Sequence, residues 1–184
     1  MPRAVSRLEE LARKVDAFFA RVSVRHATDM QCATGCSDCC HVRLSVTAAE
    51  AAAIRGHVTT WSPAQRRDLA SAGPADRCAA LDPAGRCKIY EARPLVCRSH
   101  GVPIRMRAGG LPVIHACHRN FTHTQPDPDC VLDQETLSAL LLAVNAADAA
   151  DARPVTRGPE PDEPGARPGA RSDLAELLAD LAAI

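Results

Sequence analysis

The sequence predicts a mainly α-helical fold with a loop-rich cysteine centre and a small β-hairpin. Alanine and leucine dominate its apolar residues and only five aromatic residues are present, a composition that favours helices. Apolar residues recur at helical spacing in several segments. Nine cysteines, most of them in two short segments, interrupt this helical pattern. The middle of the chain is therefore expected to be organised by its thiols rather than by regular structure.

Periodicity and capping signals predict the helices. Residues 5–28 set apolar side chains opposite charged ones at helical spacing. A capping box at Thr47 opens a short helix to about residue 55, and a second at Ser62 opens one to about residue 72. Residues 133–150 carry a leucine stripe, and residues 172–184 place four leucines on one side. These five segments account for most of the regular structure that we expect.

Shorter elements are predicted between these helices. Residues 102–107 and 111–116 read as two strands joined at Ala108-Gly109-Gly110 as a hairpin. Pro83-Ala84-Gly85 is predicted to be a turn. Pro94 is predicted to begin a short helical turn that carries Cys97.

Composition divides the chain into three parts. Residues 152–171 are rich in proline and glycine among charges, which is typical of a linker. We therefore expect a cysteine-cluster domain over residues 1–151, the linker over residues 152–171, and an amphipathic helix over residues 172–184. This helix is expected to dock on its own domain, because an isolated helix of this length is marginal in water. Docking on a protein partner stays open, and the sequence does not predict an oligomeric state.

Charge and targeting signals narrow the function. Lys+Arg and Asp+Glu both number 22, so no net field attracts nucleic acid or an anionic membrane. The charged N-terminal segment has no apolar stretch for a signal-peptide core, and no run is long enough to span a bilayer. We therefore expect a cytoplasmic protein with no nucleic-acid or membrane partner. Thiols stay reduced in that compartment, and the odd number of cysteines agrees with metal binding rather than with disulfides.

Seven cysteines form the candidate metal site: Cys32, Cys36, Cys39, Cys40, Cys78, Cys87 and Cys97. Thiolates that lie close together repel unless a cation holds them, and a Cys-x-x-Cys turn such as Cys36–Cys39 supplies two ligands to zinc. A close group of three cysteines with a remote fourth fits an iron–sulfur cluster equally well. The spacing thus predicts a metal-organised centre that holds iron, including an iron–sulfur cluster, or zinc.

Several other residues near the cysteines are candidates for supporting the metal site or the loops around it. Arg93 and Arg98 lie within the second cysteine segment, where guanidinium groups could offset the charge of a thiolate-bound cofactor. Cys117 either adds a ligand or packs at a strand end, and Cys130 is interpreted as unrelated to the site. Tyr90 is predicted to anchor its loop with a buried ring. The sequence shows no catalytic machinery beyond the metal site.

Three functional hypotheses follow. The leading one is a metal-binding module, the second an iron–sulfur redox or modification enzyme, and the third an adaptor whose metal is purely structural. The spacing of Cys32, Cys36 and Cys39 also occurs in radical enzymes that use S-adenosylmethionine. Those enzymes need a partial barrel of alternating strands and helices, which this chain lacks.

The cysteine pattern resembles a known family. The resemblance rests on Cys32-x3-Cys36-x2-Cys39-Cys40, on Arg77-Cys78-Ala79-Ala80-Leu81, and on GRCKIYEARPLVCR over residues 85–98. Over residues 32–101 the chain resembles the CxxCxxCC, or YkgJ-type, cysteine-cluster family, which is described as zinc- or iron-chelating. The first gap has three residues here, where the family name gives two. The resemblance implies metal chelation by Cys36, Cys39, Cys40, Cys78, Cys87 and Cys97, and it implies no single activity.

Overall fold

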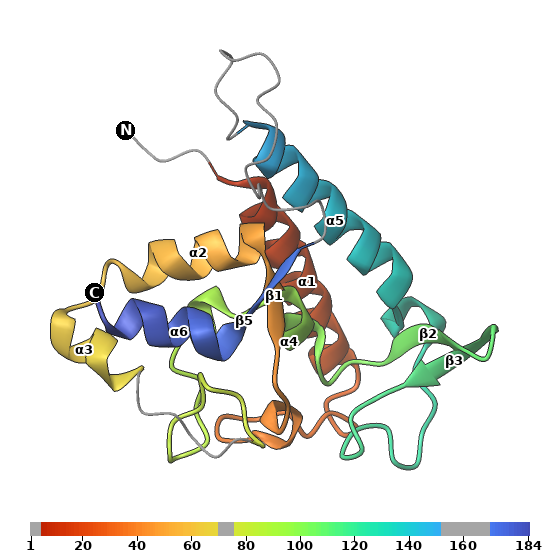
Figure 1. Ribbon diagram of the computed structural model, residues 1–184. Coiled ribbons are helices and arrows are strands. Elements are labelled where there is room, and N and C mark those ends of the chain that lie inside the picture. Colours follow the sequence, from red (N-terminus) through yellow and green to blue (C-terminus); the bar gives the residue numbers. More distant parts are fainter. Residues whose placement is uncertain (1–4, 70–75, 152–169) are drawn as a thin grey trace.

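The computed structural model describes residues 5–69, 76–151 and 170–184, so most of the predicted linker lies outside the described residues. Helices form most of the regular structure, with two small sheets and long loops (Figure 1). The fold class predicted from the sequence, mainly α with a small β-hairpin, is confirmed. The elements are α1 (Arg7–Arg25), β1 (Ser45–Thr47), α2 (Ala48–Val58), α3 (Pro63–Asp68), α4 (Leu95–Ser99), β2 (Ile104–Ala108), β3 (Leu111–His115), β4 (Leu132–Asp133), α5 (Gln134–Asp151), β5 (Arg171–Asp173) and α6 (Leu174–Ala182).

Local capping sets where the first three helices begin. Ser6, Thr47 and Ser62 each accept a hydrogen bond from the backbone N–H three residues later, and the side chain at that position returns one, which closes a capping box. The two boxes predicted from the sequence are thus confirmed. Helix α2 continues to Val58, slightly beyond its predicted end, and the predicted continuation of α3 past residue 69 lies outside the described residues.

The C-terminal helix packs on its own domain. Strand β5 pairs antiparallel with β1, with Val46 opposite Ser172, and this pairing brings α6 alongside α2 and α3 (Figure 1). All four leucines of α6 are buried in one core with residues of α2. These leucines are Leu174, Leu177, Leu178 and Leu181. Its apolar face is therefore used within the chain, and a protein partner at this helix stays a prediction.

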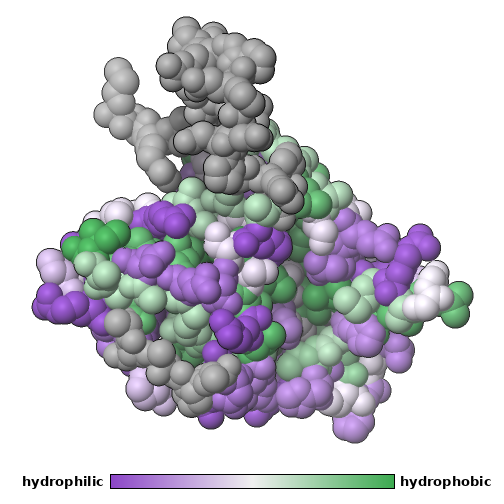
Figure 2. All heavy atoms as spheres, viewed as in Figure 1, coloured by the Kyte–Doolittle hydropathy of each residue, from purple (hydrophilic) through white to green (hydrophobic). Residues whose placement is uncertain are grey.

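A second core joins α1 to α5 and to the base of α4. Leu11 and Val15 of α1 are buried there with Leu95 and Leu137. The predicted hairpin is confirmed, since β2 and β3 pair antiparallel from Ile104 to Ala108. Strand β4 adds to β2 in parallel, a pairing that the sequence did not predict. Hydrophilic and hydrophobic side chains are interspersed on the face in Figure 2, and none of the helices in the described ranges has the length and apolarity to cross a membrane.

The carboxylate of Glu50 links these two cores. Its side chain is buried, and one oxygen accepts hydrogen bonds from the backbone N–H (2.9 Å) and hydroxyl (3.1 Å) of Thr47. The other oxygen accepts the backbone N–H of Leu95 at 3.0 Å. Leu95 is the first residue of α4, whose N-terminal N–H groups have no partner within the helix. The residue that closes the capping box of α2 therefore also holds the start of the helix that carries Cys97.

We predict that Leu178→Ala lowers the free energy of unfolding by about 3 kcal/mol, because Leu178 is 1 % exposed and its removal leaves a cavity beneath α2. The matched control is Leu140→Ala on α5, where the leucine is 48 % exposed and the expected change is within about 0.5 kcal/mol. Urea denaturation followed by circular dichroism measures both values. Equal, small effects would show that α6 is not part of the core.

Asp133 predicts a pH dependence of stability. Hydrogen bonds from Thr136 and then the Arg105 guanidinium lower the pKa of Asp133 from 3.8 to about 2. A carboxyl whose pKa is depressed by folding stabilises the fold above its unfolded pKa and loses this effect as the pH falls through its folded pKa. The stability difference between wild type and Asp133→Asn should therefore be constant above about pH 5 and shrink as the pH falls toward 2. Denaturation at each pH measures it, and a difference that does not change over this range would contradict the assignment.

Candidate metal centre

The two cysteine segments lie side by side as loops at the end of the molecule below α6 (Figure 1). The backbone N–H of Cys78 donates to the carbonyl of Cys40 at 2.7 Å. A Cβ added at Gly85 would lie 3.2 Å from the Ser37 hydroxyl, so the turn after Cys78 touches the loop before Cys40. Gly85 has a φ of +77°, which glycine adopts without strain. Backbone contacts thus hold the two segments against each other.

Local hydrogen bonds fix the second segment. The predicted turn at residues 83–85 is confirmed, and it closes with Gly85 N–H donating to the carbonyl of Asp82 at 3.0 Å. Leu81 and Cys87 form a β-bridge across this turn, which sets Cys87 near Cys78. The predicted helical turn after Pro94 is also confirmed as α4, and Cys97 lies on it.

Five thiols from both segments influence one another's ionisation: Cys39, Cys40, Cys78, Cys87 and Cys97. Burial, with a smaller contribution from nearby thiolates, raises the pKa of the Cys78, Cys87 and Cys97 thiols, that of Cys97 to about 12. The thiolate of Cys39 accepts a hydrogen bond from Cys40, with 4.0 Å between the Sγ atoms, which lowers the pKa of Cys39 to about 7 and raises that of Cys40. A bound cation that replaces the protons would relieve this mutual repulsion.

A second group of thiols surrounds Cys32. Burial raises the pKa of Cys32, and the charges of Cys117, Cys36 and Cys39 raise it further. The buried amide of Asn120 opposes them by donating to the Cys32 Sγ at 3.3 Å, and the same amide donates to the carbonyl of Gly101. The backbone N–H of Asn120 donates to the carbonyl of Cys117 at 2.8 Å. Cys117, which the sequence assigns either to ligation or to packing, therefore lies near candidate ligands. Cys39 belongs to both groups of thiols.

Two residues that hold this second group, Asn120 and Asp38, were not predicted as part of the site. Asn120 had no motif to mark it, although it is buried and bonds to Cys32. Asp38 accepts a hydrogen bond from the Arg119 Nε at 2.6 Å and lies 3.3 Å from the His118 Nε2. These contacts fasten the segment after β3 onto the first cysteine loop. Asp38 precedes Cys39 and Asn120 follows Cys117 by three residues, but their partners Arg119 and Cys32 are more than 80 positions away.

Arg93 and Arg98 both pair with Asp16 of α1. The Arg93 Nη2 lies 3.0 Å from one carboxylate oxygen, and the Arg98 Nη1 lies 2.5 Å from the other. Arg93 also lies over the ring of Tyr90, 3.9 Å from its centroid, and the charge of Arg93 opposes the raised pKa of Cys87. Tyr90 is 56 % exposed, so the prediction of a buried ring is wrong. A role of the two arginines at a cofactor stays a prediction, and the contacts that the structure gives them fasten α4 to α1.

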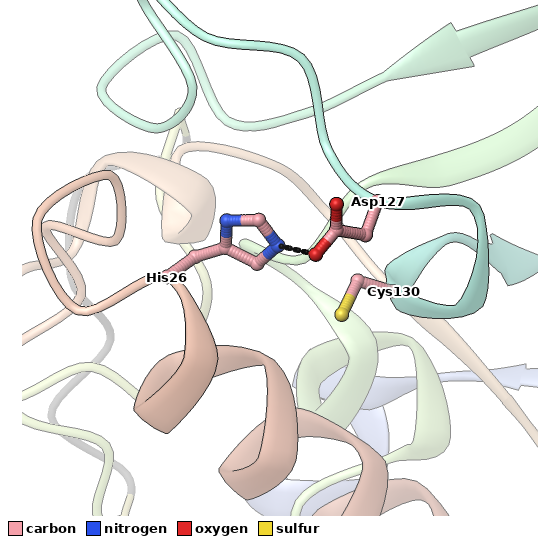
Figure 3. Close-up of side chains that lie close together, drawn as sticks. All are labelled: His26, Asp127 and Cys130. Atoms are coloured by element: carbon pink, nitrogen blue, oxygen red, sulfur yellow. Dashed lines mark ion pairs between the residues drawn. The ribbon is translucent and has the colours of Figure 1, made fainter.

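His26, Asp127 and Cys130 form a separate cluster of potential ligands (Figure 3). One donor atom of each lies within 4.8 Å of the other two, and among the described residues this is the one group of three potential ligands with that spacing. The sequence interpretation set Cys130 apart from every site, but the structure places its thiol beside an imidazole and a carboxylate. Among the described residues, no three of the candidate cysteines of the two segments bring their sulfurs within this spacing, so a metal bound there by three or more thiolates requires them to draw together.

These features define a class of protein: a small, mainly α domain in which loops gather free thiols. All nine cysteines are free thiols in the structure. The model of the CxxCxxCC family, described as a "putative zinc- or iron-chelating domain", matches residues 31–130. This match covers more than half of the chain, which therefore belongs to the CxxCxxCC family, as the sequence resemblance indicated. No curated protein and no solved structure matches the chain significantly.

Gly101 provides a test of the packing around Cys32. Its φ is +103°, and a Cβ added there would lie 2.6 Å from the Cys32 Sγ. We predict that Gly101→Ala lowers the free energy of unfolding by about 1–3 kcal/mol, because both the backbone and the thiol must shift. In the control Gly56→Ala, no atom lies within 4 Å of the added Cβ, and a glycine-to-alanine change inside a helix stabilises by about 0.5–1 kcal/mol.

Denaturation of the reduced, metal-free protein measures both variants. Loss of stability in Gly101→Ala with none in Gly56→Ala supports the packing of Cys32 against Gly101. Unchanged stability in Gly101→Ala would contradict it.

Proposed function

We propose that this chain chelates zinc or iron through thiolates of its two cysteine segments. The proposed ligands are drawn from Cys32, Cys36, Cys39, Cys40, Cys78, Cys87 and Cys97, with Cys117 as an additional candidate. The observation that carries the proposal is the contact between the segments, in which the backbone N–H of Cys78 donates to the carbonyl of Cys40 at 2.7 Å. This contact places thiols from distant parts of the chain within reach of one another's charge.

The chemistry of the donors fits both metals. Thiolate ligands select zinc and iron–sulfur clusters over hard cations such as magnesium and calcium. A tetrahedral ion takes four thiolates, so the division of the candidates into two groups that share Cys39 accommodates more than one ion. Bound zinc would cross-link the loops, whereas iron would add a redox-active centre.

The raised pKa values of three thiols in the second segment make the proposed metal binding dependent on pH. Cys78, Cys87 and Cys97 hold their protons more tightly than free cysteine does. A metal must displace these protons, so its apparent affinity should fall as the pH falls. The energy gained by coordination must exceed the cost of this deprotonation, and thiolate–metal bonds supply enough in small cysteine-rich domains, on the order of 10–16 kcal/mol for structural zinc.

The metal content of the protein tests the proposal. Purified without oxygen, the full chain should carry stoichiometric zinc or iron by elemental analysis, and an iron–sulfur cluster should absorb visible light in a way that dithionite changes. The double variant Cys36→Ser/Cys39→Ser should lose most of this metal, because it removes two thiolates from the first segment. Ser37→Ala, between the same two cysteines, should keep it. A folded wild-type protein without metal, or a double variant with full metal content, would overturn the proposal.

A further inference from the structure

The cluster of His26, Asp127 and Cys130 is built by two elements that are far apart in sequence. His26 follows the last turn of α1, and its backbone N–H donates to the carbonyl of Val22 at 2.9 Å. Asp127 and Cys130 lie on one tight turn before β4, in which Cys130 N–H donates to the carbonyl of Asp127 at 2.8 Å. Figure 3 shows the imidazole facing this turn. Both elements are regular, so the three side chains are held in place by backbone structure.

Arg25 fastens the turn to α1. Its Nε lies 2.7 Å from a carboxylate oxygen of Asp127, and its Nη1 lies 2.7 Å from Asp129. Phe121 contacts the His26 ring edge to face, with 5.0 Å between the ring centroids. The imidazole and the carboxylate thus have neighbours that restrict their orientation, as a preformed binding site requires.

The imidazole of His26 has one nitrogen with unmet bonding capacity. Its side chain is 11 % exposed, and its Nε2 is buried without a hydrogen-bond partner, although an oxygen of Asp127 lies 3.4 Å away. Buried polar atoms are nearly always hydrogen-bonded, so this atom needs an explanation. On the other side of the ring, Nδ1 lies 3.5 Å from a carboxylate oxygen of Asp29. A carboxylate behind an imidazole favours the proton on the near nitrogen and directs the lone pair of the other nitrogen toward a metal.

We propose that His26, Asp127 and Cys130 bind a single divalent transition-metal ion, at a site distinct from the cysteine centre. The donor set of one nitrogen, one oxygen and one sulfur suits zinc, for which all three are common ligands. The carboxylate and the thiolate together neutralise a divalent ion, and the nearby charges of Arg25 and Asp29 offset each other. Three protein ligands leave a fourth position for water or a small ligand, as in zinc sites that are not purely structural.

The alternative is a buried thiol beside a histidine–aspartate ion pair. Cys130 is fully buried and packs with Val22 and Val102, as an ordinary core cysteine would. Asp127, in contrast, remains 42 % exposed and offers an entry path for an ion. Under this alternative, changing His26 alters stability and leaves metal binding unchanged, so the two accounts differ in a measurable quantity.

Metal titration of the full chain tests the site. The reduced protein is freed of metal with a chelator and titrated with Zn²⁺, and the number of equivalents bound is measured; Co²⁺ serves as a coloured probe of the ligands. His26→Gln and Cys130→Ser should each bind one equivalent less than wild type. Asp127→Asn should weaken that equivalent by at least the roughly 10- to 100-fold that the loss of a residue supporting a metal ligand costs. The exposed His123 provides the matched control, and His123→Gln should bind as wild type does.

Two further arms keep the test decisive. In the Cys36→Ser/Cys39→Ser background, one equivalent that depends on His26 should remain, because none of the three ligands belongs to the cysteine centre. If Cys130→Ser does not fold, His26→Gln carries the test, since His26 is at a helix end. Wild-type stoichiometry in a folded His26→Gln protein would overturn this site and leave the proposal for the cysteine centre standing.

Discussion

The structure depends on the contact between the two loops that carry most of the thiols. The hydrogen bond from Cys78 to Cys40 and the close approach of Gly85 to Ser37 join these loops at the end of the molecule below α6. The second loop also contributes Cys78, Ala80 and Ile89 to the apolar core around α2 and α6, and Cys40 of the first loop packs against that core. The cysteine loops are therefore positioned by apolar packing as well as by backbone hydrogen bonds, and thiolates that lie close together disfavour one another's ionisation.

The carboxylates of Glu50 and Asp16 connect the second cysteine segment to helices α2 and α1. Glu50 accepts the first N–H of α4, and Asp16 of α1 pairs with Arg93, which precedes that helix, and with Arg98, which lies on it. Helix α4, which carries Cys97, is thus fastened to α2 and to α1. Removing either carboxylate would leave buried or half-buried donors without partners, which costs more than the loss of an exposed ion pair. These contacts of Glu50 and Asp16 thus hold the helix on which the candidate ligand Cys97 lies.

Local signals in the sequence predicted the local structure well. Thr47 with Glu50 and Ser62 with Gln65 gave the helix starts, Pro94 gave α4, and the glycines between β2 and β3 gave the hairpin, because each depends on neighbouring residues alone. Contacts between distant residues could not be predicted in this way. No periodicity indicates that Glu50 also caps α4 or that Asn120 reaches Cys32.

The same limit applies to the potential ligands. Adjacent cysteines and a matching family pattern made the cysteine centre visible in the sequence. His26 and Cys130 are brought together only by the packing of α1 against the turn before β4, so each reads as an isolated residue in the sequence. Tyr90 shows the opposite error, because an aromatic ring suggests burial, whereas the cation of Arg93 covers this ring at the surface.

X-ray absorption at the metal edge of the anaerobically purified full chain tests the central claim most directly, because it reports the atoms that surround the bound metal. The account predicts a first shell dominated by sulfur, at about 2.3 Å for zinc, with a smaller nitrogen and oxygen contribution that His26→Gln reduces. A first shell of nitrogen and oxygen alone would contradict the claim that the two cysteine segments hold the metal.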